Sequence, residues 1–312
     1  MIVAVSLNPA VDKYLRLPRL RRGEHLEAQE AISSAGGKAI NVAGVLRMLG
    51  EEVQLLGFFG GFTGQYILAE VAREGIQADP VMVEALTRTA FVLVEEDGSE
   101  TEVVEPGAPV TAEEVAALRA KLRAAAPQAA VVVLSGSVPP GCGDDIYVRL
   151  LEDCAGHCPV LVDTSRAPLR TLLAAAPSPG PALIKPNRRE AQAALGAPLE
   201  GLDSIAAALR HFRACGVALP TLSDSAAGLY ALIGDEIWLA EPPALERVNS
   251  VGSGDAAVAG FAAGMARRSE PAHQLRLAAA CGAANVLTKE CAQVRADDVA
   301  RLLPQIRISQ PR

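Results

Sequence analysis

Residues 2–7 read Ile2-Val3-Ala4-Val5-Ser6-Leu7, a short apolar run that is typical of a buried strand. Further runs of the same kind follow along the chain at Val53–Phe58, Ala130–Leu134, Val160–Val162 and Leu183–Ile184. Each run is followed by a stretch with helical apolar spacing, so strands and helices alternate. This alternation predicts βαβ units, and therefore an α/β fold in which helices cover both faces of a mostly parallel sheet.

The stretches between the strands carry apolar residues at intervals of three and four. We expect helices at Ala39–Leu49, Gln65–Arg73, Ala112–Ala125, Ile205–Cys215, Ala256–Arg267 and Gln274–Leu287. A hairpin near Gly228–Trp238 is expected at an edge of the sheet.

Two regions interrupt the alternation. Thr89–Val94 and Thr101–Val104 flank the turn Glu96-Asp97-Gly98-Ser99, and Asp-Gly is a strong signal for a β-hairpin. The segment Asp12–Ser33 contains only short strand-like pieces, at Tyr14–Leu17 and around Glu27–Ile32. Because the sequence contains no Gly/Ser-rich linker, we expect one domain, residues 1–312. We expect it to carry a small β-sheet lid formed by about 12–33 and 87–105.

The composition limits the kinds of partner. The chain has 312 residues, of which 50% are hydrophobic, and a net charge of −7. This charge gives no basic surface for nucleic acid or an anionic membrane, so we expect neither partner. The first residues lack the features of a signal peptide, which predicts a cytoplasmic protein. The apolar stretch Ala256–Ala266 is far shorter than the roughly 20 residues that a membrane span needs.

The strongest chemical feature is the turn Gly252-Ser253-Gly254-Asp255, which leads into the apolar run Ala256–Phe261. Glycines let a ligand approach the backbone, and the free N–H groups at a helix start bind phosphate oxygens. Asp255 could then accept a hydroxyl proton. Taken alone, the motif fits a simple helix start better, where Asp255 would stabilise the helix by about 0.3–1 kcal/mol. A dinucleotide fingerprint is less suitable because the turn lies near the C-terminus and contains an acid.

A second glycine turn, Gly36-Gly37-Lys38-Ala39-Ile40-Asn41, precedes an expected helix. Lys38 can act as a point charge on a phosphate, and Asn41 lies three residues further on the same helix face, where its amide could meet sugar hydroxyls. An ordinary turn followed by a helix is the alternative. The P-loop pattern Gly-x-x-x-x-Gly-Lys-Ser/Thr does not occur in the sequence.

A third motif, Lys185-Pro186-Asn187-Arg188-Arg189-Glu190, directly follows the strand-like pair Leu183–Ile184. Asn187 and Glu190 would share one helix face and could hold water around Mg²⁺. The same spacing fits a capping box with Asn187 as the cap, and the two interpretations are compatible.

Together these motifs resemble the PfkB branch of the ribokinase-like family. The resemblance also covers Leu7-Asn8-Pro9-Ala10-Val11-Asp12 and Ser135-Gly136-Ser137-Val138-Pro139-Pro140-Gly141, so it spans nearly the whole chain in order. It implies a three-layer α/β/α sandwich with a small β-sheet lid. It also implies a carbohydrate kinase, a phosphotransferase that uses ATP and Mg²⁺ to phosphorylate an alcohol group. The set is most similar to tagatose-6-phosphate kinase and 1-phosphofructokinase, whose products are sugar bisphosphates.

The resemblance assigns a role to each motif. Asp255 would be the base, beside an anion hole formed by Gly252, Ser253 and Gly254. The phosphosugar would be held by Asp12, Gly37, Lys38, Asn41, Arg88 and Ser137, with Lys38, Arg88 and Ser137 on its phosphate. The nucleotide would lie along Thr221–Gly228 and meet Lys185, Asn187, Thr221, Ser223, Gly228 and Asn285. Asn187 and Glu190 would organise Mg²⁺ through water.

Three residues depart from the family pattern. Ala39 and Ser223 each stand where glycine is usual, which bears on the choice of sugar and of nucleotide, and Ser253 replaces the commoner alanine. The sequence leaves open fructose 1-phosphate, fructose 6-phosphate and tagatose 6-phosphate as the substrate. It is also compatible with a nucleoside kinase or with a non-catalytic sugar-phosphate sensor. The exposed lid is a natural place for a homodimer contact.

Overall fold

A computed structural model describes residues 1–288 and 291–311 of the chain, so the expected single domain of 1–312 includes three residues outside the described ranges. Within these ranges, ten strands form one sheet in the order β14-β13-β12-β11-β10-β9-β8-β1-β4-β5. The strands are β1 (Ile2–Ser6), β4 (Val53–Gly60), β5 (Gln77–Val83), β8 (Val131–Ser135), β9 (Val160–Asp163), β10 (Leu183–Ile184), β11 (Leu219–Ser223), β12 (Leu229–Ile233), β13 (Glu236–Glu241) and β14 (Arg307–Ser309). Every pairing from β5 across to β11 is parallel, and the three pairings from β11 to β14 are antiparallel.

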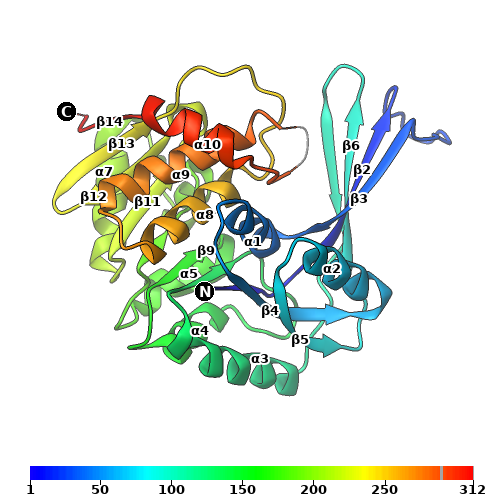
Figure 1. Ribbon diagram of the computed structural model, residues 1–312, viewed down its shortest axis with the longest axis horizontal. Coiled ribbons are helices and arrows are strands. Elements are labelled where there is room, and N and C mark those ends of the chain that lie inside the picture. Colours follow the sequence, from blue (N-terminus) through cyan, green and yellow to red (C-terminus); the bar gives the residue numbers. More distant parts are fainter. Residues whose placement is uncertain (289–290, 312) are drawn as a thin grey trace.

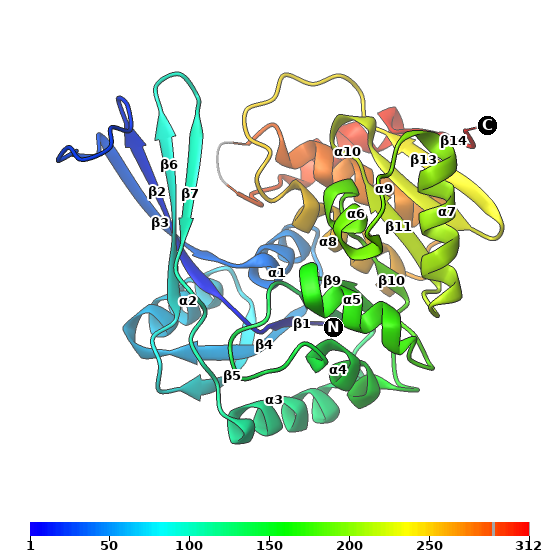
Figure 2. The ribbon, with the colours of Figure 1, turned by 180° about the vertical axis from the view of Figure 1, so that it is seen from behind.

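Helices cover both faces of this sheet, as Figures 1 and 2 show from opposite sides. One face packs against α1 (Lys38–Met48), α2 (Gly61–Arg73), α8 (Ser253–Ala266), α9 (Pro271–Asn285) and α10 (Ala296–Leu302). The other face packs against α3 (Ala112–Ala125), α4 (Ile146–Cys154), α5 (Arg166–Ala175), α6 (Arg188–Leu195) and α7 (Gly201–Ala214). The expected three-layer α/β/α sandwich is confirmed.

The strand β1 illustrates why the central strands are apolar on both sides. Ile2 and Ala4 belong to the core on the face of α1 and α8, whereas Val3 and Val5 belong to the core on the face of α3 and α4. Side chains of a strand point alternately to opposite faces, so a strand between two helical layers has no polar side. This is why the central strands could be recognised as continuous apolar runs.

A separate four-stranded sheet forms the lid within the described ranges, in the order β3-β2-β6-β7. Its strands are β2 (Ala10–Leu17), β3 (Glu30–Gly36), β6 (Arg88–Glu95) and β7 (Glu100–Val104), and the last two form the expected Asp-Gly hairpin. In both views the lid stands apart from the loop that leads into α8 (Figures 1 and 2).

The structure differs from the expected elements in several places. The strand β5 and the helix α10, for example, were not expected. The helices α4 and α5 lie outside the expected ranges, because their 9 and 10 residues give too few repeats for apolar spacing to be recognised, whereas α6 was expected only from the capping box at its start. The α2 helix begins at Gly61, four residues before the expected start. The hairpin of β12 and β13 was expected at the sheet edge, but the short strand β14 pairs outside β13.

In the described part of the chain, no helix combines the length and apolar character needed to cross a membrane.

Candidate active site

The turn before α8 requires glycine at its first position. Gly252 caps the helix with a φ of 85°, in the left-handed region. A Cβ atom on Gly252 would lie 2.6 Å from the backbone nitrogen of Ala292 and 2.7 Å from Sγ of Cys291. No other residue fits such a position without displacing its neighbours. The turn is therefore tightly enclosed, and its N–H groups mark the start of a 14-residue helix.

Asp255 lies in the first turn of α8 and is only 7% exposed. One of its oxygens, Oδ2, accepts a hydrogen bond of 2.8 Å from Nδ2 of Asn41 on α1. Burial raises the pKa of Asp255 to about 6, although Lys38 and the bond from Asn41 act in the opposite direction. The carboxylate is therefore ionised at neutral pH but basic enough to take up a proton.

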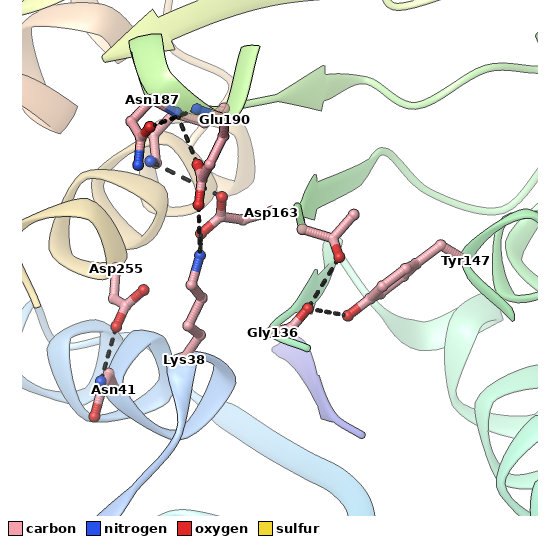
Figure 3. Close-up of polar contacts among 10 residues, drawn as sticks. Lys38, Asn41, Gly136, Tyr147, Asp163, Asn187, Glu190 and Asp255 are labelled. Carbon is pink, nitrogen blue, oxygen red and sulfur yellow. Dashed lines mark hydrogen bonds and ion pairs between the residues drawn. The ribbon is translucent and has the colours of Figure 1, made fainter. Parts of the chain in front are cut away.

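Lys38 begins α1 and points toward a group of carboxylates (Figure 3). Its Nζ lies 3.2 Å from Oδ2 of Asp163 and 3.9 Å from Oε1 of Glu190. Attraction to Asp163 raises the pKa of Lys38 despite burial, and Asp255 adds to this effect. Lys38 therefore stays charged between the start of α8 and the start of α6.

Asp163 is a member of this site that sequence reasoning missed. It ends β9, is 2% exposed, and has Lys185 Nζ 3.9 Å from its Oδ1. Lys185 in turn lies beside the glycine turn, since a Cβ on Gly254 would be 3.4 Å from its Nζ. The available signal was the position of Asp163 at the carboxyl end of a parallel strand, where α/β sheets bind ligands.

Asn187 and Glu190 form the expected capping box at the start of α6. Oδ1 of Asn187 accepts from the Glu190 N–H at 2.8 Å, and Oε2 of Glu190 accepts from the Asn187 N–H at 2.9 Å. Oε1 of Glu190 is left facing Lys38 (Figure 3). No group of three His, Cys, Asp or Glu side chains within residues 1–288 and 291–311 is arranged to hold a metal ion directly. The free carboxylate oxygen of Glu190 instead fits a Mg²⁺ ion held through water and ligand phosphates.

The lid contributes a second polar network. Asp12 on β2 packs so closely on Gly36 that a Cβ there would lie 2.1 Å from its Oδ2. Burial raises the pKa of Asp12 to about 6, and Arg88 opposes this shift. Arg88 donates to the backbone oxygen of Asn8 at 3.2 Å, and the Asn8 side chain donates to Ser137 Oγ at 3.0 Å. Arg88 and Ser137 are thus joined through Asn8, whereas Lys38 is bound to Asp163.

The residues expected along the nucleotide lie at the ends of β11 and β12. Ser223 bridges to Asn187. Gly228 has a φ of 107°, and a Cβ there would lie 2.1 Å from the backbone oxygen of Ala240, so this position requires glycine. Thr221 is fully buried and donates to the backbone oxygen of Ile184 at 2.6 Å. Thr221 therefore ties β11 to β10 in this structure.

Asn285, also expected to contact the nucleotide, supports the glycine turn from behind. Its side chain is 0% exposed. Its Nδ2 donates to the backbone oxygen of Val251 at 2.8 Å and to Ser253 Oγ at 3.0 Å. The amide thereby fixes the turn that begins α8.

Comparison with known proteins agrees with this architecture. Residues 3–297 match the family model described as pfkB family carbohydrate kinase. A 1-phosphofructokinase from Xanthomonas campestris pv. campestris is 38% identical over 272 residues, which cover 84% of this chain and 83% of that protein. Phosphofructokinase-2 from Escherichia coli, crystallised with potassium, superposes with a TM-score of 0.91 at 23% identity, covering 97% of this chain and 98% of that one. A structure described as a putative phosphofructokinase from Staphylococcus aureus gives a TM-score of 0.83 at 28% identity, covering 99% and 98%.

Proposed function

Because the chain belongs to the pfkB family of carbohydrate kinases, and is therefore a sugar kinase, we propose that it phosphorylates a ketohexose monophosphate to the bisphosphate, with fructose 1-phosphate as the preferred substrate. The 38% identity to a 1-phosphofructokinase favours this substrate over tagatose 6-phosphate, which the sequence motifs left open. The family implies ATP as the phosphoryl donor.

One observation carries the proposal: a buried carboxylate stands at a helix start with two lysines nearby. Asp255 follows the enclosed glycine turn, and Lys185 lies beside that turn. The positive charge of Lys38 favours the ionised form of Asp255. A base, an anion-binding helix end and cations in one place are the parts that phosphoryl transfer requires. An aspartate that only stabilised the start of a helix would not need two lysines beside it.

In the proposed mechanism, Asp255 accepts the proton of the attacking hydroxyl. The turn Gly252–Gly254 and Lys185 stabilise the charge on the transferring group, and Lys38 would meet the phosphate already on the sugar from the side of α1. Mg²⁺ bound to the nucleotide would neutralise phosphate charge, and Glu190 would orient its water ligands. Arg88 and Ser137 would bind the phosphate already on the sugar, and Asp12 would bind its hydroxyls. The lid would then exclude water.

A panel of acceptors tests the proposal. Purified protein with ATP and Mg²⁺ is assayed for phosphorylation of fructose 1-phosphate, fructose 6-phosphate, tagatose 6-phosphate, ribose and adenosine. We expect the highest kcat/KM for fructose 1-phosphate, and Asp255→Asn should lower kcat by about 10²–10⁴ with little change in binding. Faster turnover of ribose or adenosine would reject the phosphosugar assignment, and unchanged turnover in Asp255→Asn would reject the base.

We also propose a single kinase domain that acts in the cytoplasm and pairs with a second copy through the lid. The lid exposes large apolar side chains, with Ile32 at 41%, Val103 at 53% and Val104 at 42%. Exposed apolar strands favour such contacts. Sedimentation of the native protein beside Val103→Glu tests the dimer: a monomeric native protein would contradict it.

A further inference from the structure

Asn41 makes a contact that its expected role as a sugar ligand does not require. It lies in the first turn of α1, and its Nδ2 donates to Oδ2 of Asp255 across the α1–α8 contact at 2.8 Å (Figure 3). An ionised carboxylate can only accept hydrogen bonds, so the amide must turn its nitrogen, and not its oxygen, toward Asp255.

The same nitrogen has a second partner that fixes the amide further. Nδ2 of Asn41 lies 3.5 Å from Sγ of Cys291. Burial raises the pKa of the Cys291 thiol, so the sulfur stays uncharged and adds no negative charge beside Asp255. Both amide hydrogens are thereby directed at protein atoms, and only the carbonyl oxygen of Asn41 is left to face a substrate.

We propose that Asn41 is a positioning residue for Asp255, which holds Oδ2 in place so that the other carboxylate oxygen, Oδ1, faces the reacting hydroxyl. Among the residues that the structure describes, no hydrogen bond to Oδ1 is recorded, whereas Oδ2 is occupied. The inference rests on the proposed function, because it takes Asp255 as the base. It goes beyond a sugar-binding role, because it makes Asn41 act on the proton acceptor itself.

The charges around Asp255 determine the direction of the expected pH effect. Lys38 and Asn41 on α1, Asp163 at the end of β9 and Lys185 after β10 act on the carboxylate. The charge of Asp255 in turn raises the pKa of Asp12 on the lid and of Cys291 after α9. Asn41 lowers the pKa of Asp255, because a hydrogen bond to the ionised form favours that form. Loss of the amide should therefore raise the pKa, and the base would become protonated at higher pH.

The test compares Asn41→Leu with Cys291→Ala, which keeps the bond from Asn41 to Asp255. The pH profile of kcat/KM is measured with the best acceptor. We expect the acidic limb of Asn41→Leu to move upward by about one pH unit, and its kcat to fall roughly 10–100-fold. Cys291→Ala should keep the limb of the native enzyme. Asn41→Ser provides the same comparison if leucine disrupts the packing of α1.

The outcomes separate this inference from the proposed function. An increase in KM for the sugar with an unmoved acidic limb would show that Asn41 is only a substrate ligand. An equal shift in Cys291→Ala would also overturn the inference. Carboxyl-carbon NMR titration of the substrate-free protein gives a readout without turnover, with the Asp255 signal assigned by its loss in Asp255→Asn. If Asp255→Asn is inactive but the Asp255 titration is the same in Asn41→Leu, the base stands and the role of Asn41 fails. If Asp255→Asn keeps full turnover, both fail.

Discussion

Lys38 and Asp163 lie 125 positions apart in the chain, yet their side chains meet at 3.2 Å in the site. Asp163 is almost fully buried, and its carboxylate is paired with the cations around it. Lys38 is one of these cations and Lys185, at 3.9 Å, is the other. The pair links the start of α1 to the end of β9, and so connects the proposed sugar-binding side to the proposed nucleotide side.

Replacement of Lys38 should therefore affect both stability and substrate binding. Lys38→Met leaves Asp163 with one cation, Lys185, and the Lys38 side chain is 38% exposed, so we expect a loss of about 1–3 kcal/mol in the free energy of unfolding. Lys38→Met combined with Asp163→Asn should regain part of this loss, which denaturant unfolding of the single and double variants measures. Additive losses would mean that the pair is not coupled.

The expected phosphate contact of Lys38 is tested separately by kinetics. Lys38→Ala should raise KM for the phosphosugar far more than KM for an unphosphorylated sugar. Because Arg88 lies in the other network, with Asn8 and Ser137, Arg88→Ala is the matched comparison. Suppose that Lys38→Ala raises KM equally for the phosphorylated and the unphosphorylated sugar, while Arg88→Ala raises KM only for the phosphorylated one. The phosphate of the sugar is then bound by Arg88, and Lys38 contacts the transferred phosphoryl group instead.

Removal of the charge on Asp255 should stabilise the fold. Its folded-state pKa of about 6 lies above the ordinary 3.8, so the stability that this group contributes is fully present below about pH 3.8 and is lost as pH rises through 6. Asp255→Asn should raise the free energy of unfolding at pH 7.5 by about 1–3 kcal/mol, with little difference at pH 4. Urea unfolding at both values checks this, with the exposed Asp144→Asn as control. A variant less stable at pH 7.5 would contradict it.

The two glycines of the turn should respond differently to alanine. Gly252→Ala places a Cβ 2.6 Å from a backbone nitrogen at a φ of 85°, whereas a Cβ on Gly254 meets only the end of Lys185 at 3.4 Å. We expect Gly252→Ala to cost about 2–4 kcal/mol of stability and to abolish measurable activity, and Gly254→Ala to fold normally. Thermal unfolding and the kinase assay distinguish the two, and equal stability of the variants would contradict the geometry.

The hydrogen bonds from Asn285 to the turn before α8 allow a second comparison between two variants. Asn285→Leu leaves two part-buried acceptors without their donor, the Val251 oxygen and Ser253 Oγ, while Ser253→Ala removes only one partner. We expect a loss of about 1–3 kcal/mol for Asn285→Leu and at most about 1 kcal/mol for Ser253→Ala. If Asn285→Leu instead changes KM for ATP alone and leaves stability intact, the residue is a nucleotide ligand, as the family resemblance implies.

The sequence predicted the features that depend on residues close to one another in the chain. The continuous apolar runs of β1 and β8 predicted buried parallel strands, and the spacing of Asn187 and Glu190 predicted a capping box that the structure contains. Both depend on residues a few positions apart, where backbone geometry alone decides which side chains meet.

Contacts between distant parts of the chain could not be predicted in the same way. Asn41 and Asp255 are 214 positions apart, and each occurs in a motif that made sense without the other. Asp163 belongs to no local motif, and only the parallel order of β8, β9 and β10 brings it beside Lys38 and Lys185. The sequence therefore indicated which residues are chemically useful, but not which of them hold one another in place.

The packing of α8 on α9 has a mechanical consequence. A Cβ on Gly260 would lie 2.6 Å from Cα of Ala278, and one on Gly264 would lie 2.9 Å from the side chain of Gln274, so the two helices pack more closely than a larger residue at either position would allow. The helix that carries Asp255 is thus held closely against α9 at two positions one helical turn apart. Backbone amides of α8 should accordingly be among the last in the molecule to exchange with solvent.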